Sequence, residues 1–417
     1  MSRARSLRLR VGLVRFFGDL SCLGAGIPPK NEATGWCGAP TVGSVSTYSW
    51  DDLQALSTAR QFPADLADLG VGAAVDRVGP MQTQTARSAF IGLGARRPGL
   101  TLDRITDAYE RGEIVRGSTI RGTVHTSTPS QHRLLQAATA VGLRALQRRT
   151  LGLDDDLLDR LWPMLEADAA DEWRPATELV EALQRAVAGL DPAGEPRSWD
   201  QVGRSLAHGH GGLVRRPSRG GWDRQVTPLY RSADVVVDRG PVPDDPLAEL
   251  VRGHLRSHGP ASRYDLAWWA GVGVTVVDPV LARLGDELTA RPGPDGRTYH
   301  DLASGTPDGT AFRGVRLLPE FDAVLCAYDP KARRRFVDDE IDQVLWNQAN
   351  GLVLPPLLVD GRIGGFWRST GSARRRPLAV TLLGRTRRPR QAELTDAVAA
   401  LAASLDLVVT DVTLERA

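Results

Sequence analysis

The feature that most constrains the fold is an order of elements that occurs three times between residues 85 and 299. Each copy has two short stretches with helical spacing of apolar residues, a Gly-containing or Pro-containing break between them, and two strand-like pieces joined by a turn. A helix, a tight turn, a second helix and a hairpin form the winged-helix arrangement. Its recurrence indicates a tandem array.

The predicted elements of the three copies follow the same order but differ in sequence. The predicted helices cover residues 85–95 and 102–111, then 177–187 and 199–207, then 262–270 and 274–284. The predicted strands cover residues 113–116 and 120–125, then 212–216 and 224–227, then 287–291 and 297–299.

The sequence pattern changes after about residue 311. Asp360-Gly361 lies between apolar runs, which is a strong hairpin signal. Further strands are expected at 378–383 and 405–414, with an amphipathic helix at 392–404 between them. These patterns predict a β-rich C-terminal unit.

A chain of 417 residues is too long for one compact core, and two to four units are expected. Residues 1–48 are rich in Gly, Ser, Pro and Thr and predict a disordered extension, although a start codon assigned too far upstream would look the same. Ser49 is expected to cap a helix that runs to about residue 61. The predicted class is α+β, with an extension, three winged helices and a β-rich domain at residues 1–48, 49–165, 166–245, 246–310 and 311–417.

Arginine supplies nearly all of the positive charge. Of 52 basic residues only Lys30 and Lys331 are lysines, yet the net charge is +2. Coding bias accounts for much of this excess of arginine over lysine. The arginine guanidinium can also donate two hydrogen bonds to one phosphate, so a local basic groove would suit nucleic acid. The predicted wings carry Arg116 and Arg121, then Arg215, Arg216 and Arg219, then Arg291 and Arg297. These side chains either follow a phosphate backbone or decorate exposed loops, as arginines do throughout such a chain.

Several classes of site are not indicated by the sequence. Cys22, Cys37 and Cys326 have no metal-ligand spacing, and the seven histidines form no cluster, so neither a metal nor another cofactor is expected. No run of apolar residues is long enough to span a membrane. There is no phosphate loop or nucleophile elbow either. A reduced cytoplasmic protein that binds DNA, such as a winged-helix regulator without catalytic activity, is therefore one hypothesis.

Gln82-Thr83-Gln84 is the candidate site. Pro80 disfavours helical angles at Gly79, so the chain is expected to enter this segment extended. In a strand Gln82 and Gln84 share one face, where their carboxamides can hold a water molecule but cannot act as acid or base. The alternative is an ordinary solvated polar face.

Five segments in order carry a resemblance to a known family. They are Gln82-Thr83-Gln84, Arg121-Gly122-Thr123-Val124-His125, Leu266-Ala267-Trp268-Trp269-Ala270-Gly271, Leu317-Leu318-Pro319-Glu320-Phe321-Asp322 and Leu358-Val359-Asp360-Gly361-Arg362. From about Trp50 to the C-terminus the chain resembles the AlkZ-type winged-helix DNA glycosylases, which include the YcaQ-like proteins.

The resemblance implies a C-shaped array of three winged helices and a β-rich unit around duplex DNA, with Gln82 and Gln84 as catalytic residues in the concave channel. A sister branch has aspartate at the second position, so Gln84 places the chain in the branch without a carboxylate. That branch is associated with excision of bulky N7-alkylguanine adducts or interstrand crosslinks, often as self-resistance to a DNA-alkylating natural product. We therefore expect a monomeric, cytoplasmic, nucleoid-associated glycosylase whose partner is double-stranded DNA with alkylated purines.

Other residues have expected roles beside the glutamines. Arg121 suits a phosphate and His125 a hydrogen bond near the lesion, although Arg121 pairing with a local acid and His125 being an ordinary satisfied polar side chain are equally open. Glu320 and Asp322 are expected to be structural. Arg362, beside the Asp360-Gly361 turn, is a candidate for contact in a DNA groove.

Overall fold

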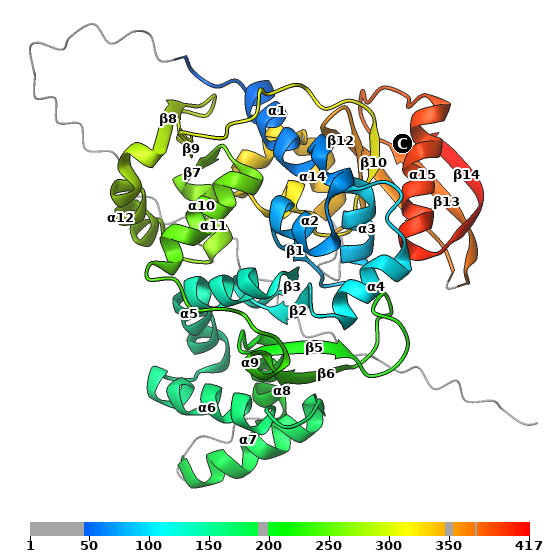
Figure 1. The fold of residues 1–417 in the computed structure, drawn as a ribbon. Coiled ribbons are helices and arrows are strands. Elements are labelled where there is room, and N and C mark those ends of the chain that lie inside the picture. Colours follow the sequence, from blue (N-terminus) through cyan, green and yellow to red (C-terminus); the bar gives the residue numbers. More distant parts are fainter. Residues whose placement is uncertain (1–45, 191–198, 347–352, 372) are drawn as a thin grey trace, which may run out of the picture.

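The computed structural model describes residues 46–190, 199–346, 353–371 and 373–417, and its elements form the mixed helix and sheet fold that was predicted (Figure 1). The first segment contains α1 Trp50–Gln61, η1 Ala64–Asp68, α2 Val71–Val78, β1 Met81–Gln82, α3 Ser88–Arg96, α4 Leu102–Glu110, β2 Val115–Ser118, η2 Ile120–Gly122, β3 Val124–Ser127 and α5 Pro129–Leu151. The second contains α6 Asp155–Asp168, β4 Arg174–Pro175, α7 Ala176–Leu190, α8 Trp199–Gly209, β5 Leu213–Pro217, β6 Pro228–Ser232 and α9 Ala233–Val236.

The remaining elements complete two further sheets. The third segment contains α10 Pro246–His258, β7 Ala261–Ser262, α11 Arg263–Ala270, α12 Val274–Leu284, η3 Gly285–Glu287, β8 Leu288–Pro292 and β9 Thr298–Leu302. The C-terminal part contains β10 Val315–Leu317, α13 Ala323–Cys326, η4 Pro330–Arg335, α14 Asp339–Trp346, β11 Pro356–Val359, β12 Arg362–Ser369, β13 Arg375–Leu382, α15 Gln391–Leu405 and β14 Val408–Arg416.

Several predicted boundaries are wrong. Of the predicted strand 120–125, residues 120–122 form the 3-10 turn η2, and β3 begins only at Val124. Residues 224–227 form no strand, because the second hairpin returns only at β6, after a long loop. The predicted extension over residues 1–48 falls mainly outside the described residues. Its last residue is ordered, because Tyr48 is buried and its amide donates to the Pro292 carbonyl at 2.9 Å. The helix that Ser49 caps is α1, with the Ser49 hydroxyl accepting from the Asp52 amide.

Two of the three expected hairpins share a sheet. The six-stranded sheet has the order β1-β3-β2-β5-β6-β4, and β2 meets β5 where Gly117 pairs with Val214. The third hairpin, β8 and β9, forms a separate sheet with β7. The strand that carries Gln82 is therefore continuous, through hydrogen bonds, with the second wing.

The first segment also shares its core with the C-terminal sheet. Phe90 and Ile105, from α3 and α4, belong to one buried apolar cluster with Trp367 and Val380 of that sheet. In Figure 1, α15 lies between α3 and the strands β13 and β14. Gly94 allows this close approach, because a Cβ there would stand 2.7 Å from Ser404. The winged-helix division remains a prediction, but the first segment does not pack as an isolated unit.

Candidate active site

The Gln82 strand is held between a helix end and the first hairpin. α2 stops at Gly79, which has a φ of 87° and would bring a Cβ to 2.9 Å from the Ser257 hydroxyl. Both the backbone conformation and the space therefore favour glycine. β1 then pairs antiparallel with β3, with Met81 opposite Thr126 and Gln82 opposite His125.

The side chains of this strand alternate between two environments. Thr83 is buried and its hydroxyl accepts from that of Thr126, which also contacts the Tyr109 hydroxyl at 2.5 Å. Gln82 and Gln84 have the opposite parity. β1 ends at Gln82 and Gln84 lies in a bend after it, so a shared face for the two glutamines remains a prediction from their spacing.

The two glutamines differ in hydrogen bonding. Gln84 is half-buried, and its Oε1 accepts a long hydrogen bond of 3.4 Å from the Val124 amide. Gln82 is only 7% exposed, and its Oε1 is buried without a hydrogen-bond partner among the described residues. A buried carbonyl without a partner is unfavourable unless another molecule donates to it.

His125 lies beside Gln82 on the same face, because directly opposed residues of an antiparallel pair project together. Its Nδ1 lies 2.9 Å from the Thr123 carbonyl, so this nitrogen carries the proton and donates it. Burial, together with the nearby Arg121 charge, lowers the pKa of His125 to about 3. The ring is neutral at physiological pH, and its buried Nε2 has no partner in the described part of the chain.

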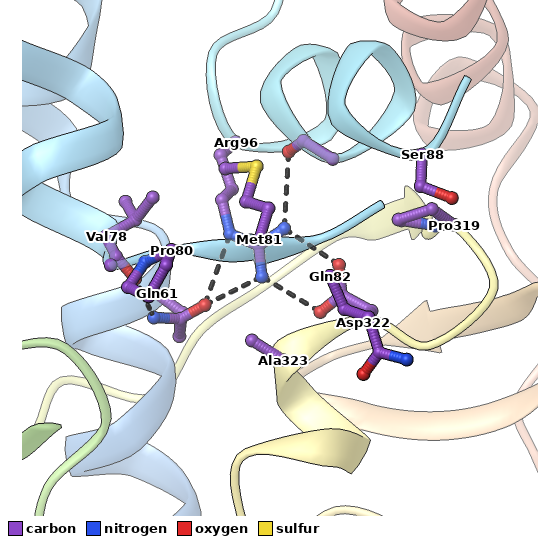
Figure 2. Close-up of a pocket in the computed structure, with 12 residues that line it drawn as sticks. Gln61, Val78, Pro80, Met81, Gln82, Ser88, Arg96, Pro319, Asp322 and Ala323 are labelled. Atoms are coloured by element: carbon purple, nitrogen blue, oxygen red, sulfur yellow. Dashed lines mark hydrogen bonds and ion pairs between the residues drawn. The ribbon is translucent and has the colours of Figure 1, made fainter. Parts of the chain in front are cut away.

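A small cavity lies behind the strand, where it is lined by Gln82, Met81, Ser88 and neighbouring residues (Figure 2). Its volume of about 10 Å³ suits about one water molecule and not a base. Arg96 forms two hydrogen bonds of 2.9 Å with the Asp322 carboxylate, and its Nη2 also donates to Gln61 Oε1 at 2.7 Å. Asp322 is thus fully engaged in a buried ion pair.

Glu320, the second carboxylate of this segment, contacts Arg87 at 2.6 Å through Oε1. Its Oε2 is buried and unpaired within the described residues. Between the two carboxylates Phe321 adopts a left-handed φ of 60°, which is rare for a bulky residue. This backbone turns Glu320 toward Arg87 and Asp322 toward Arg96.

Arg121 occupies the turn between β2 and β3. Its φ is 53°, its Nη1 donates to the Trp268 carbonyl at 3.1 Å, and its guanidinium lies 5.1 Å from the Trp268 ring centre. Burial lowers the pKa of Arg121 to about 10. No carboxylate forms a salt bridge with Arg121 among the residues that the structure describes.

Two of the wing arginines are interior. Arg116 is buried, and its Nη2 donates to the carbonyls of Ala86 and Trp222, both at 3.0 Å. Arg215 is buried against the His208 carbonyl and the Ser118 hydroxyl. Because these guanidinium groups are buried as well as bound to protein oxygens, the structure does not support the expectation that they contact phosphates.

The other expected DNA contacts divide into two kinds. Arg216 and Arg219 are exposed near and on the loop between β5 and β6. Arg362 is half-buried and pairs with Asp338 at 2.6 Å. Gly361, at the turn beside it, is buried against Gln54, so this turn is not free to enter a groove in this structure.

The loop of residues 218–227, called here the wing-2 loop, packs onto the candidate site. The Gln225 Oε1 accepts a hydrogen bond of 2.8 Å from the Ala86 amide, two residues after Gln84. Trp222 stacks on Tyr109 with ring centres 4.3 Å apart, and its Nε1 donates to Glu110 at 2.7 Å. Neither Trp222 nor Gln225 was predicted from the sequence, where the one signal was a tryptophan directly after the turn-like Ser218-Arg219-Gly220-Gly221.

Two searches of the described residues bear on other kinds of site. No group of three or more His, Cys, Asp or Glu side chains there is arranged to hold a metal ion. In that part of the chain no single helix is long and apolar enough to cross a membrane, whereas one bent pair, Arg263–Ala270 with Val274–Glu287, meets the length and composition test.

Comparison with known proteins identifies the family. The model of the family described as DNA glycosylase AlkZ-like matches residues 75–404. The structure is similar to that of the Streptomyces sahachiroi DNA glycosylase AlkZ, with a TM-score of 0.71, 20% sequence identity, and coverage of 88% of this chain and 100% of the other. No curated protein sequence matches. At this identity the structural likeness shows the fold, whereas the family model covers most of the chain. The resemblance seen in the sequence is confirmed, and the chain belongs to the AlkZ-like DNA glycosylase family.

Proposed function

We propose that this DNA glycosylase excises N7-alkylguanines, including bulky adducts or interstrand crosslinks, from double-stranded DNA by hydrolysis of the N-glycosidic bond. The observation that carries the proposal is a pair of acceptors, Gln82 Oε1 and His125 Nε2, on adjacent strands and the same face, neither of which has a hydrogen-bond partner within the described ranges of the chain. The alternative hypothesis, a winged-helix regulator without catalytic activity, is set aside because the matching family is described as DNA glycosylases.

The two acceptors can orient one water molecule. A water has two hydrogens, and donating one to Gln82 and one to His125 directs its lone pair away from both groups. Gln84, half-buried two residues further along the chain, would add a second carboxamide dipole. The arrangement favours a held water over a protonated catalyst, because His125 is neutral and glutamine does not titrate.

The substrate must then supply its own leaving-group activation. An N7-alkylguanine carries a positive charge, so the C1′–N9 bond can break without protonation and its electron pair neutralises the base. The sugar becomes oxocarbenium-like, the water oxygen bonds to C1′, and the proton lost by water passes to solvent. Oriented carbonyl dipoles stabilise the developing positive charge on the sugar, and proximity of the water supplies the rest.

Glu320 provides the alternative water-activating group, because one of its oxygens is buried and unpaired within the described residues. Its other oxygen binds Arg87, which supports the structural role expected from the sequence. Glu320→Gln separates the two roles. Base release within about tenfold of the wild-type rate supports the glutamine mechanism, whereas loss of release comparable to that of a Gln82 variant supports the carboxylate.

The test is base release from duplexes that contain N7-methylguanine, a bulky N7-guanine adduct, an interstrand crosslink or a neutral alkylated base. We expect free alkylguanine and an abasic site from the cationic lesions, and none from the neutral base. Release of the neutral base at an equal rate would contradict the proposal. A monomeric protein acting at the nucleoid, in self-resistance to a DNA-alkylating natural product, is the setting that we propose for this activity.

A further inference from the structure

We propose that Arg87, Arg224 and Arg376 together bind one phosphate of the DNA strand next to the candidate active site. The three side chains come from the start of α3, the wing-2 loop and strand β13, which are far apart in the sequence. This phosphate clamp deepens the proposed function and rests on it, since the ligand is the backbone of the same DNA substrate.

One hydrogen bond joins the two segments that carry Arg87 and Arg224. Ala86 and Gln225 are joined through the Ala86 amide, and Arg87 and Arg224 are the residues next to them in the chain. Arg87 has a side chain that is 34% exposed, and that of Arg224 is 62% exposed. Both side chains are therefore partly exposed, on segments that are joined two residues after Gln84.

Arg376 completes the cluster from the β12–β13 hairpin. It is half-buried, its Nη1 donates to the Gly371 carbonyl at 2.8 Å, and its Nε has no partner among the described residues. Burial lowers the pKa of Arg376, and the charges of Arg87 and Arg224 lower it further. Three like charges at one place are unfavourable unless an anion joins them.

The protein's own carboxylates neutralise this cluster only in part. Glu320 contacts Arg87 at 2.6 Å, and Asp223 lies 3.3 Å from the Arg224 Nε. The Asp223 charge raises the pKa of Arg376 and so partly offsets the effect of Arg87 and Arg224. Arg376 itself has no salt bridge to a carboxylate within the described residues, so a positive charge is left for a ligand.

The position of the cluster favours a backbone phosphate of DNA. Arg87 follows Gln84 by three residues, which span at most about 11 Å of chain. That distance corresponds to about three nucleotides along one strand. Arginine donors on a phosphate fix the register of the duplex without reading its sequence, which suits an enzyme that must place one sugar at Gln82.

The test is a scan of single methylphosphonates, which remove the charge of one phosphate at a time, across a duplex with a tetrahydrofuran abasic analogue at the target position. Wild-type binding should weaken about tenfold at one or two adjacent positions close to the target, as expected for one charged hydrogen-bond contact. Arg376→Ala and Arg224→Ala should each weaken binding to the unmodified duplex. For these variants, a methylphosphonate at that same position should cause no further loss of affinity.

Arg374→Ala is the matched control, since Arg374 lies two residues from Arg376 and pairs instead with Asp406. This variant should bind the unmodified duplex with wild-type affinity, and a methylphosphonate at the sensitive position should weaken its binding as it does for the wild type. The proposal is wrong if the methylphosphonate weakens the binding of Arg376→Ala as much as that of the wild type. It is also wrong if methylphosphonates at all positions weaken wild-type binding equally. Binding is measured on a duplex that cannot react. An absence of base release in the activity assay would therefore refute the proposed function, whereas the binding data would still test the phosphate clamp.

Discussion

The Gln225 carboxamide oxygen accepts a hydrogen bond of 2.8 Å from the backbone amide of Ala86, and this bond joins the wing-2 loop to the segment that carries the catalytic candidates. Arg116 strengthens the junction, because its Nη2 donates to both the Ala86 and the Trp222 carbonyls. The exposed outer side of the same loop carries Arg219 and Arg224. We expect DNA contact at this loop to be coupled to the position of Gln84 through the Gln225–Ala86 hydrogen bond.

Gln225→Ala should slow base release about tenfold, since a lost hydrogen bond of about 1.4 kcal/mol no longer fixes the backbone after Gln84. The melting temperature should change little, because Gln225 is exposed overall. Single-turnover release at saturating enzyme measures the effect, and Gln201→Ala, at an exposed glutamine of α8, is the control. An unchanged rate for Gln225→Ala would show that the loop does not position the site.

Asp322→Ala should destabilise the protein by about 3 to 5 kcal/mol, because it leaves the buried Arg96 charge without its partner. Chemical denaturation measures the loss. At low temperature, the fraction that remains folded should release base at close to the wild-type rate. A stable variant without base release would instead assign chemistry to this carboxylate.

The rate of base release should be nearly independent of pH between about pH 5 and pH 8. Glutamine does not titrate, and burial lowers the pKa of His125 to about 3, so no catalytic group changes charge in this range. His125→Leu should lower the rate about tenfold at every pH through loss of an acceptor. A wild-type rate that rises tenfold per pH unit on acidification would indicate a general acid.

Folding stability, in contrast, should fall on acidification below about pH 6.5. Burial lowers the pKa of His254 and His132 to about 3, so the unfolded chain binds these protons first and folding loses stability as the pH falls toward 3. Each such histidine contributes about 1.4 kcal/mol per pH unit. His254→Leu should flatten the dependence of unfolding free energy on pH by about this slope, whereas an unchanged slope would mean that His254 is accessible to protons when folded.

Local signals in the sequence were sufficient for most elements of the fold. α12 lies at the predicted residues, and Ser49 caps α1 through its hydroxyl. The Asp360-Gly361 turn joins β11 and β12 with positive φ at both residues. Caps, turns and hydrophobic spacing act over a few residues, so a single sequence contains them.

Long-range relationships were not accessible in the same way. Nothing local distinguishes Arg116, which is buried, from Arg216, which is exposed. Arg335 is fully buried, 4.3 Å from the Tyr328 ring centre, although its sequence Arg333-Arg334-Arg335 suggests an exposed run. The sequence gives the positions of the arginines along the chain, whereas their burial depends on which segments pack together in the folded structure. The pairing of Gln82 with His125 and the packing of Trp222 likewise depend on tertiary structure.

The catalytic role of the two glutamines is tested by single-turnover release of N7-methylguanine from duplex DNA, measured for the wild type and for Gln82→Ala with Gln84→Ala. The double variant should release base at least 100-fold more slowly, since oriented dipoles of this kind contribute about two to three orders of magnitude to a rate. Its affinity for the tetrahydrofuran duplex should stay within about threefold of the wild type, as the phosphate contacts are intact. Base release by the double variant at the wild-type rate would contradict the account.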